Sequence, residues 1–235
     1  MIYLEDRELE EMVLSGKSCI AVPIEIYVPE NDEAQITTYS CFYKIAEEFE
    51  RLFKNNLLSE EALNWLDQKI YTDVKMFGYE HSFDDIHMMS EYSMNSIDQL
   101  CKFKNDDVFL IKSESDIYSY DNSLIDGISI DKEAAVVIKD NKLVSISCIN
   151  DVSFDDGSVE IYVETDAEYR NKGYGAAAVS LIAEKYLNKG ITVRYKCAKN
   201  NIASIKLSEK CGFIKNGEKY SYVCFAIENN YNNYN

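Results

Sequence analysis

The 235-residue sequence predicts a mainly helical α+β part over residues 1–105, followed by an α/β domain over residues 106–228. Before residue 105, apolar residues recur at helical spacing in two long segments. After it, short strand-like segments alternate with two helical ones. The pairs Asp140-Asn141 and Asn216-Gly217 are typical of the tight turns that join antiparallel strands. A chain of this length, with 46% hydrophobic residues, suits one large domain or two small ones.

Two helices and one strand are expected in the first part. Residues 40–56 and 59–76 repeat apolar side chains at helical spacing. Residues 19–28 are apolar and β-branched, and Pro23 favours an edge strand there. The polar stretch 102–107, where helical patterning gives way to strand patterning, marks the expected boundary.

The second part has the order β-β-β-α-β-α-β-β. Its expected strands are 134–139, 142–149, 158–164, 192–198, 213–215 and 219–227. Its expected helices, 175–188 and 201–211, end at Gly190 and Gly212, since glycine suits the left-handed residue that closes a helix. The polar tail 229–235 is expected to be disordered.

Negative charge is concentrated in the first half of the sequence. Residues 1–130 hold 27 acidic and 10 basic residues, whereas residues 131–235 hold 14 of each, so the net charge of −17 comes from the first part. This charge repels phosphates and anionic lipids, so neither a nucleic acid nor a membrane is an expected partner. Two interpretations stay open: a solvated acidic surface, or a site that attracts cations.

The cysteines and histidines indicate a cytoplasmic protein without a metal. Seven scattered cysteines lack any CxxC spacing and read as reduced thiols. The amino terminus lacks a secretory pattern, and no apolar run approaches the ~20 residues that span a bilayer. His81 and His87 have no third ligand nearby, and the pairs Asp84-Asp85 and Asp106-Asp107 read as surface or helix-start residues.

The segment most informative about function is Arg170-Asn-Lys-Gly173-Tyr-Gly175, between an expected strand and an expected helix. Two glycines one residue apart let backbone N–H groups turn toward a common point, and the helix amino terminus adds its dipole. This arrangement can bind a phosphate or pyrophosphate. A plain strand-to-helix turn that uses glycine is the alternative.

Two other nucleotide loops do not fit this segment. A P-loop requires GK[ST], which is absent after Gly175. Gly173, Gly175 and Ala178 match G-x-G-x-x-A literally, but ten positions separate Val163 from Gly173, whereas a dinucleotide fingerprint directly follows its strand. The next strand also ends without an acidic residue for a ribose, and only 60 residues follow Gly175.

Two motifs occur in order on this part of the chain. Arg170–Gly175 fits [QR]-x-x-G-x-[GA], and residues 201–213 (Asn-Ile-Ala-Ser-Ile-Lys-Leu-Ser-Glu-Lys-Cys-Gly-Phe) fit N-x-x-[AS]-x-x-L-Y-E-K-x-G-F except at the tyrosine. In these two motifs the chain resembles the GNAT superfamily of N-acetyltransferases, and the resemblance covers about residues 134–228. Within that superfamily, it looks like the subgroup that includes a zwittermicin-resistance acetyltransferase. The resemblance implies a mixed-sheet α/β fold, acetyl-CoA as co-substrate and no metal.

The resemblance also implies which residues hold the cofactor. Backbone N–H groups of residues 171–176 would bind the CoA pyrophosphate, and the strand 161–163 would pair with the pantetheine arm. Asn201 and Ser204 would contact the pantetheine and phosphate region, or serve only as a helix cap and a first-turn residue. The expected cofactor-binding residues are Ile161, Tyr162, Val163, Arg170, Asn171, Lys172, Gly173, Tyr174, Gly175, Ala176, Asn201 and Ser204.

Catalytic residues are less clearly marked. Acetyl transfer to an amine requires a base, and the resemblance points to Glu160, with Glu164 in reserve, both on one face of their strand. Ser208 stands where many family members have a tyrosine that protonates the leaving thiolate. Because a serine hydroxyl is a much poorer acid, water, Tyr220 or Tyr222 are alternative proton sources.

The expected reaction moves the acetyl group of acetyl-CoA to a primary amine of a small, cationic molecule. The first part of the chain would help form the acceptor site. Two alternative functions stay open: a degenerate domain that binds acyl-CoA without turnover, and an acetyltransferase of protein lysines or amino termini. A homodimer also stays open.

Overall fold

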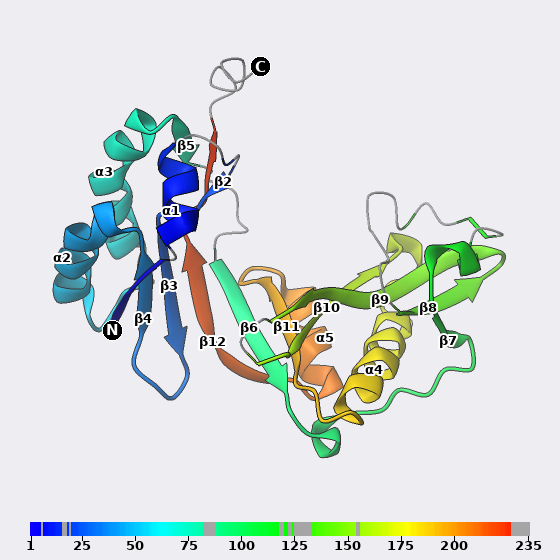
Figure 1. The fold of residues 1–235 in the computed structure, drawn as a ribbon. Coiled ribbons are helices and arrows are strands. Elements are labelled where there is room, and N and C mark those ends of the chain that lie inside the picture. Colours follow the sequence, from blue (N-terminus) through cyan, green and yellow to red (C-terminus); the bar gives the residue numbers. More distant parts are fainter. Residues whose placement is uncertain are drawn as a thin grey trace, which may run out of the picture. The chain divides into compact units, whose positions relative to one another are not determined.

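The computed structural model describes residues 1–5, 7–15, 18, 20–81, 88–117, 120–121, 124, 133–153 and 156–226 (Figure 1). The chain forms two compact units. Unit 1 comprises residues 1–90, 198–200 and 216–235, and unit 2 comprises residues 91–197 and 201–215. These bounds differ from the parts expected from the sequence, and the division into domains at residue 105 stays a prediction. Three sequence predictions concern residues outside the described ones: the disorder of the tail 229–235, the surface pair Asp84-Asp85, and His87.

Unit 1 combines a sheet with helices packed on it. Its sheet strands are β1 (Ile2–Leu4), β3 (Ile24–Pro29), β4 (Gln35–Thr38) and β12 (Ile214–Ser221), in the order β1-β4-β3-β12. Its helices are α1 (Arg7–Leu14), α2 (Tyr43–Phe53) and α3 (Glu60–Met76), and a smaller sheet has the order β2 (Ile20–Ala21), β13 (Cys224–Ala226), β5 (Tyr79–His81). Ser59 caps α3 by accepting the Ala62 N–H, and Phe49, Leu66 and Ile70 are fully buried. The two predicted helices are therefore confirmed.

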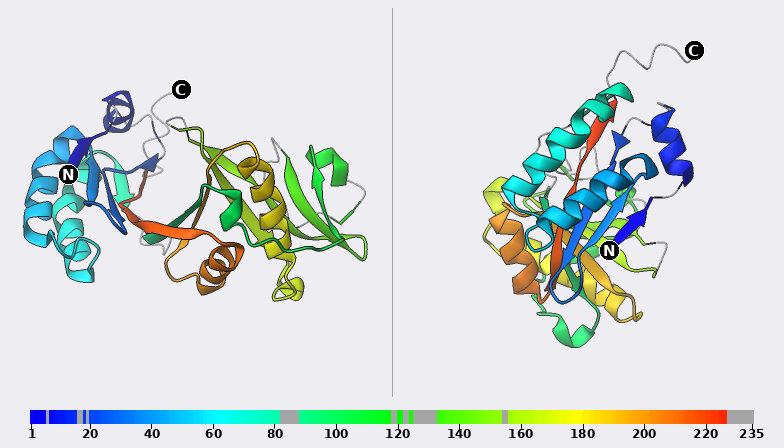
Figure 2. Two further views of the ribbon diagram at one scale, coloured as in Figure 1. Left: turned by 90° about the horizontal axis from the view of Figure 1, so that it is seen from below. Right: turned by 90° about the vertical axis from the view of Figure 1, so that its left-hand side faces the viewer.

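Unit 2 has the mixed α/β architecture that the sequence predicts. Its strands are β6 (Met88–Met94, in this unit from Glu91), β7 (Val108–Ile111), β8 (Ala134–Lys139), β9 (Lys142–Val152), β10 (Val159–Thr165) and β11 (Val193–Ala198, in this unit as far as Cys197). Their order is β6-β11-β10-β9-β8-β7. Strands β7 to β10 pair antiparallel, whereas β10 and β11 pair parallel. Helix α4 (Tyr174–Leu187) packs on β7–β10 and against α5 (Ile202–Cys211) (Figure 2).

Small apolar side chains bring α4 close to the sheet. Helical spacing predicts one apolar face made of Ala178, Val179, Ile182, Ala183 and Tyr186. The first four are fully buried, and Tyr186 is half-buried. This face packs in one cluster with side chains of β10 and β11, including Ile161 and Val193. The expected turn at Asp140-Asn141 is present too, with φ of 48° and 65° at its two residues. The helices and turn that shape this unit are thus confirmed within about a residue.

The predicted hairpin at Asn216-Gly217 is wrong. Strand β12 runs through both residues, and Gly217 pairs with Pro29 of β3. A Cβ atom at Gly217 would lie 2.5 Å from the carbonyl oxygen of Val28. Glycine is needed here for a close approach between strands, not for a turn.

Among the described residues, none of the helices has the length and apolar character required to cross a bilayer.

Replacing Gly212 by alanine should destabilise unit 2 strongly. Gly212 closes α5 at φ +97°, and an added Cβ would lie 2.0 Å from the carbonyl oxygen of Gln99. Gly190 is the matched control, because it has φ +73° but nothing within 4 Å of such a Cβ. We expect Gly212→Ala to lower the free energy of unfolding by about 3 kcal/mol or more, and Gly190→Ala by about 1–2 kcal/mol. Equal losses in urea titrations would contradict this account of the α5 terminus.

Candidate functional site

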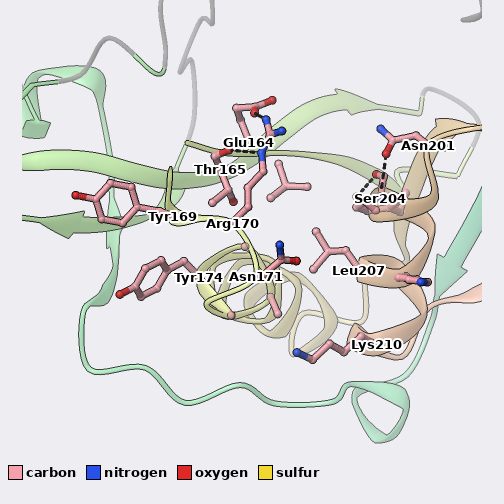
Figure 3. Close-up of a pocket in the computed structure, with 17 residues that line it drawn as sticks. Glu164, Thr165, Tyr169, Arg170, Asn171, Tyr174, Asn201, Ser204, Leu207 and Lys210 are labelled. Carbon is pink, nitrogen blue, oxygen red and sulfur yellow. Dashed lines mark hydrogen bonds and ion pairs between the residues drawn. The ribbon is translucent and has the colours of Figure 1, made fainter. Parts of the chain in front are cut away.

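A cavity of about 470 Å³ opens in unit 2 between β10, the amino-terminal end of α4, β11 and α5 (Figure 3). Its walls come from segments far apart in the sequence. Its lining residues are Val163, Glu164, Thr165, Tyr169, Arg170, Asn171, Gly173, Tyr174, Gly175, Ala176, Tyr195, Asn201, Ala203, Ser204, Lys206, Leu207 and Lys210. Both sequence motifs therefore contribute to one cavity.

The cavity lies where β10 separates from β11. The two strands pair only at Val159 with Val193 and at Glu160 with Arg194. On its other side, β10 stays paired with β9 as far as Thr165. From Ile161 onward, β10 therefore presents a backbone edge that β11 does not cover. Such an edge can pair with an extended ligand.

The amino-terminal end of α4 presents backbone donors to the cavity. Gly173 precedes the helix at φ +85° and makes no side-chain capping bond, and Asn171 is also left-handed at φ 62°. The first helical hydrogen bond runs from Ala177 N to Gly173 O. The N–H groups of residues 174–176 precede that bond, and their residues line the cavity. These donors and the helix dipole together suit an anion such as a phosphate.

Gly175 allows α4 to approach β10 closely. A Cβ atom at Gly175 would lie 3.0 Å from Thr165 Oγ1 and 3.8 Å from Val163 Cγ2. A larger side chain would therefore push the helix terminus away from the strand or project into the cavity.

The basic residues of the loop play different parts. Arg170 Nε donates to Thr165 O at 3.0 Å, and its Nη2 lies 3.2 Å from Glu164 Oε1, so its guanidinium ties the loop to the end of β10. Lys172 does not line the cavity; its ammonium lies 4.7 Å from the centre of the Tyr169 ring. Positive charge comes instead from Lys206 and Lys210 of α5, which sequence reasoning missed although their four-residue spacing places them on one helix face.

The start of α5 carries a network of hydroxyl and amide groups. Asn201 Oδ1 accepts the Ser204 N–H at 3.1 Å, so Asn201 is the helix cap. Ser204 Oγ lies 2.6 Å from Tyr195 Oη of β11. Burial raises the pKa of Tyr195 to about 12, although the Ser204 hydrogen bond acts in the opposite direction. Asn201, Ser204 and Tyr195 all line the cavity.

The two candidate bases have different surroundings. The strand alternation predicted for β10 is confirmed, because Val159, Ile161 and Val163 pack with α4 and Tyr162 packs in a different cluster. Glu160 does not line the cavity; it accepts from Asn150 Nδ2 at 3.2 Å and lies 2.8 Å from Lys196 Nζ and 3.8 Å from Arg194 Nη1.

Glu164 does line the cavity. Its carboxylate accepts from Tyr162 Oη at 3.3 Å and pairs with Arg170. The pKa of Tyr162 is raised, mainly because the phenol is partly buried and secondly because of the negative charge of Glu164.

The sequence-predicted proton donors lie away from the cavity. Ser208 is fully buried, and its Oγ donates to Ile205 O at 2.8 Å. Tyr220 and Tyr222 belong to the core of unit 1, where Tyr222 Oη donates to Asp67 Oδ1 at 2.5 Å, and burial raises the pKa of both phenols. None of these three residues lines the cavity. In the described part of the chain, no group of three or more His, Cys, Asp or Glu residues is placed to hold a metal ion.

Comparison with known proteins agrees with this geometry. The sequence model of the acetyltransferase (GNAT) family matches residues 97–213, which span both cavity motifs. No curated protein matches the chain by sequence.

A solved structure of a GNAT protein resembles the chain in fold. A putative acetyltransferase of the GNAT family from Novosphingobium aromaticivorans is 16% identical, with a TM-score of 0.50, and the match covers 64% of this chain and 68% of that one. A GCN5-related N-acetyltransferase-like protein from Streptococcus suis is 13% identical over 94% of this chain and 92% of its own, with a TM-score of 0.46. Through residues 97–213, the chain belongs to the acetyltransferase (GNAT) family.

Proposed function

We propose that the protein transfers the acetyl group of acetyl-CoA to a primary amine of a small, cationic molecule. The observation that carries this proposal is the cavity at the separation of β10 and β11. It combines an open strand edge with an uncapped helix amino terminus. A ligand with a diphosphate at one end and an extended, amide-containing arm at the other matches both features.

The cofactor would bind along these two features. The backbone N–H groups of residues 171–176 would hold the diphosphate, with Lys206 and Lys210 supplying positive charge. The arm would pair with the free edge of β10 and bring its thioester to the point of strand separation. Asn201 and Ser204 would contact the arm from α5. No metal takes part in this proposal.

The acceptor amine must lose a proton to attack the thioester carbonyl. Glu160 and Glu164 project from the same face of β10, and either carboxylate can accept that proton directly or through water. Glu164 borders the cavity, whereas Glu160 is held among Asn150, Lys196 and Arg194. We propose Glu160 as the base, with Glu164 as the alternative.

Gly175→Val should weaken acetyl-CoA binding severely while the protein stays folded. The added side chain would meet Thr165 and Val163 and occupy the space in front of the backbone donors. Gly157→Ala serves as the control, because Gly157 lies outside the cavity and has nothing within 4 Å of its would-be Cβ. We expect calorimetric titration to show at least about a tenfold loss of affinity for Gly175→Val, which corresponds to about 1.4 kcal/mol. Unchanged affinity would contradict the proposed cofactor site.

Glu160→Gln should reduce kcat by roughly 10²–10⁴ if Glu160 is the general base. The amide keeps the shape of the side chain but removes its basicity, so the dissociation constant of acetyl-CoA should hardly change. Glu164→Gln is the paired variant. Survival of activity in Glu160→Gln together with its loss in Glu164→Gln would assign the base to Glu164.

Salt should affect the acceptor more than the cofactor. The net charge of −17 attracts a protonated amine, and ions weaken this attraction as the Debye length shortens to below ~10 Å. For an active amine, kcat/KM should fall clearly between ~0.05 and ~0.5 M salt, whereas acetyl-CoA affinity should fall much less. A flat salt profile, or a neutral or acidic acceptor preferred in a substrate screen, would show that the acidity serves solvation only.

CoA release separates transfer from binding. In a panel of polyamines, aminoglycosides, amino-sugar antibiotics and peptides, release with a small amine supports the proposal. Binding of acetyl-CoA without release to any amine would identify an acyl-CoA-binding module, and release only with peptides would identify a protein acetyltransferase.

A further inference from the structure

Tyr195 has no part in the mechanism described above, although its hydroxyl group forms a pair with that of Ser204 in the cavity wall. Tyr195 projects from β11 and Ser204 from the first turn of α5, and their oxygens lie 2.6 Å apart. Both residues line the cavity, on the side contributed by β11 and α5, whereas the free backbone edge belongs to β10. Tyr195 is the first residue of β11 beyond the last pair with β10, Glu160 with Arg194. The pair therefore lies at the strand separation, where the proposed function puts the thioester.

Both hydroxyl groups are held in place by their surroundings. The Tyr195 ring packs against Phe213, with centroids 5.5 Å apart, and edge-on against Tyr92, and only 2% of Tyr195 is exposed. Ser204 is anchored because its N–H donates to Asn201 Oδ1. A phenol fixed in this way needs little reorganisation to act on a ligand in the cavity.

The other hydroxyl groups near the cavity are less suited to a sulfur atom at the strand separation. Thr165 Oγ1 is already paired with Ser145 Oγ at 2.8 Å. Tyr169 and Tyr174 lie beside each other at the anion-binding loop, with ring centroids 6.4 Å apart. Ser208, buried and bonded to Ile205 O, does not reach the cavity.

We propose, on the basis of the function proposed above, that Tyr195 donates a hydrogen bond and then a proton to the CoA sulfur as the thioester breaks. Ser204 is a positioning residue that orients the phenol. Burial raises the pKa of Tyr195 to about 12, so at neutral pH the phenol is a hydrogen-bond donor.

The reaction balances without any further reagent. The amine nitrogen forms a bond to the carbonyl carbon, and the bond between this carbon and sulfur then breaks. Sulfur keeps the electron pair and takes the proton from Tyr195 Oη, which gives CoA as the free thiol. The phenolate regains a proton that the amine nitrogen loses, through the general base and water. Nothing is oxidised or reduced.

Binding of CoA and of desulfo-CoA, which lacks the sulfur, tests the contact without relying on activity. The wild type should bind CoA more tightly than desulfo-CoA, and Tyr195→Phe should reduce this affinity ratio by about threefold to tenfold, the worth of one hydrogen bond. Ser204→Ala should reduce the ratio in the same direction by a smaller factor. Tyr186→Phe is the matched control, because it removes a half-buried phenol of unit 2 that does not line the cavity, and it should leave the ratio unchanged.

Turnover supplies the second readout. Tyr195→Phe should lower kcat by about 10²-fold or more with the dissociation constant of acetyl-CoA unchanged, whereas Tyr186→Phe should keep wild-type kcat. If CoA binds but the affinity ratio is the same in wild type and Tyr195→Phe, the inference is wrong while the proposed function stands. If the wild type binds neither ligand, the proposed function itself fails, and the inference with it. If Tyr195→Phe does not fold, Ser204→Ala provides the test. An unchanged ratio of CoA to desulfo-CoA affinity in that variant also overturns the inference.

Discussion

The parting of two parallel strands is the constraint on which the site depends. Strands β10 and β11 share only two residue pairs, and β10 then continues alone beside β9. Backbone N–H and C=O groups on a strand edge need hydrogen-bond partners. An uncovered edge inside a folded domain therefore offers these groups to an extended ligand. Every other feature of the cavity is arranged around this edge: α4 begins beside it, and α5 contributes the side chains that complete the wall.

Close packing between α4 and β10 sets the position of the backbone N–H donors at the amino-terminal end of α4. The buried face of α4 is rich in alanine, which allows the helix axis to lie near the sheet. Gly175 extends this close approach to the first turn, where a Cβ would already meet Thr165. Arg170 then ties the loop back to Thr165 and Glu164. The same contacts that stabilise the domain thus fix the N–H groups relative to the strand edge.

The sequence predicted those features whose signal is local. Helix α4 was expected at residues 175–188 and is found within one residue, because apolar periodicity and a closing glycine both mark it. The hairpin at Asn216-Gly217 was wrong, because the same glycine serves a close contact with Val28 that depends on another part of the chain. Strand β7 was not anticipated, since its exposed Phe109 and Leu110 break the alternation typical of a half-buried strand.

The residues of the candidate site also fall into those that the sequence predicts and those that only the folded chain brings together. Gly173 and Gly175 were expected from their spacing in the loop, and Arg170, Asn201 and Ser204 from the resemblance to the GNAT family. All five line the cavity. Tyr195 could not be predicted, because its relation to Ser204 arises only when β11 packs against α5. Ser208 shows the converse: its place in a motif suggested a role at the sulfur, but its side chain bonds within its own helix.

The most direct test of the central claim is an NMR titration of the ¹⁵N-labelled protein with CoA. If the cofactor occupies the separation of β10 and β11, the largest amide shifts should fall on residues 171–176 of the loop and on residues 161–165 of β10. Amides at the paired end, Val159 and Glu160, should change much less. Shifts that are absent from both the loop and the strand edge, or that cluster in unit 1 alone, would contradict the account.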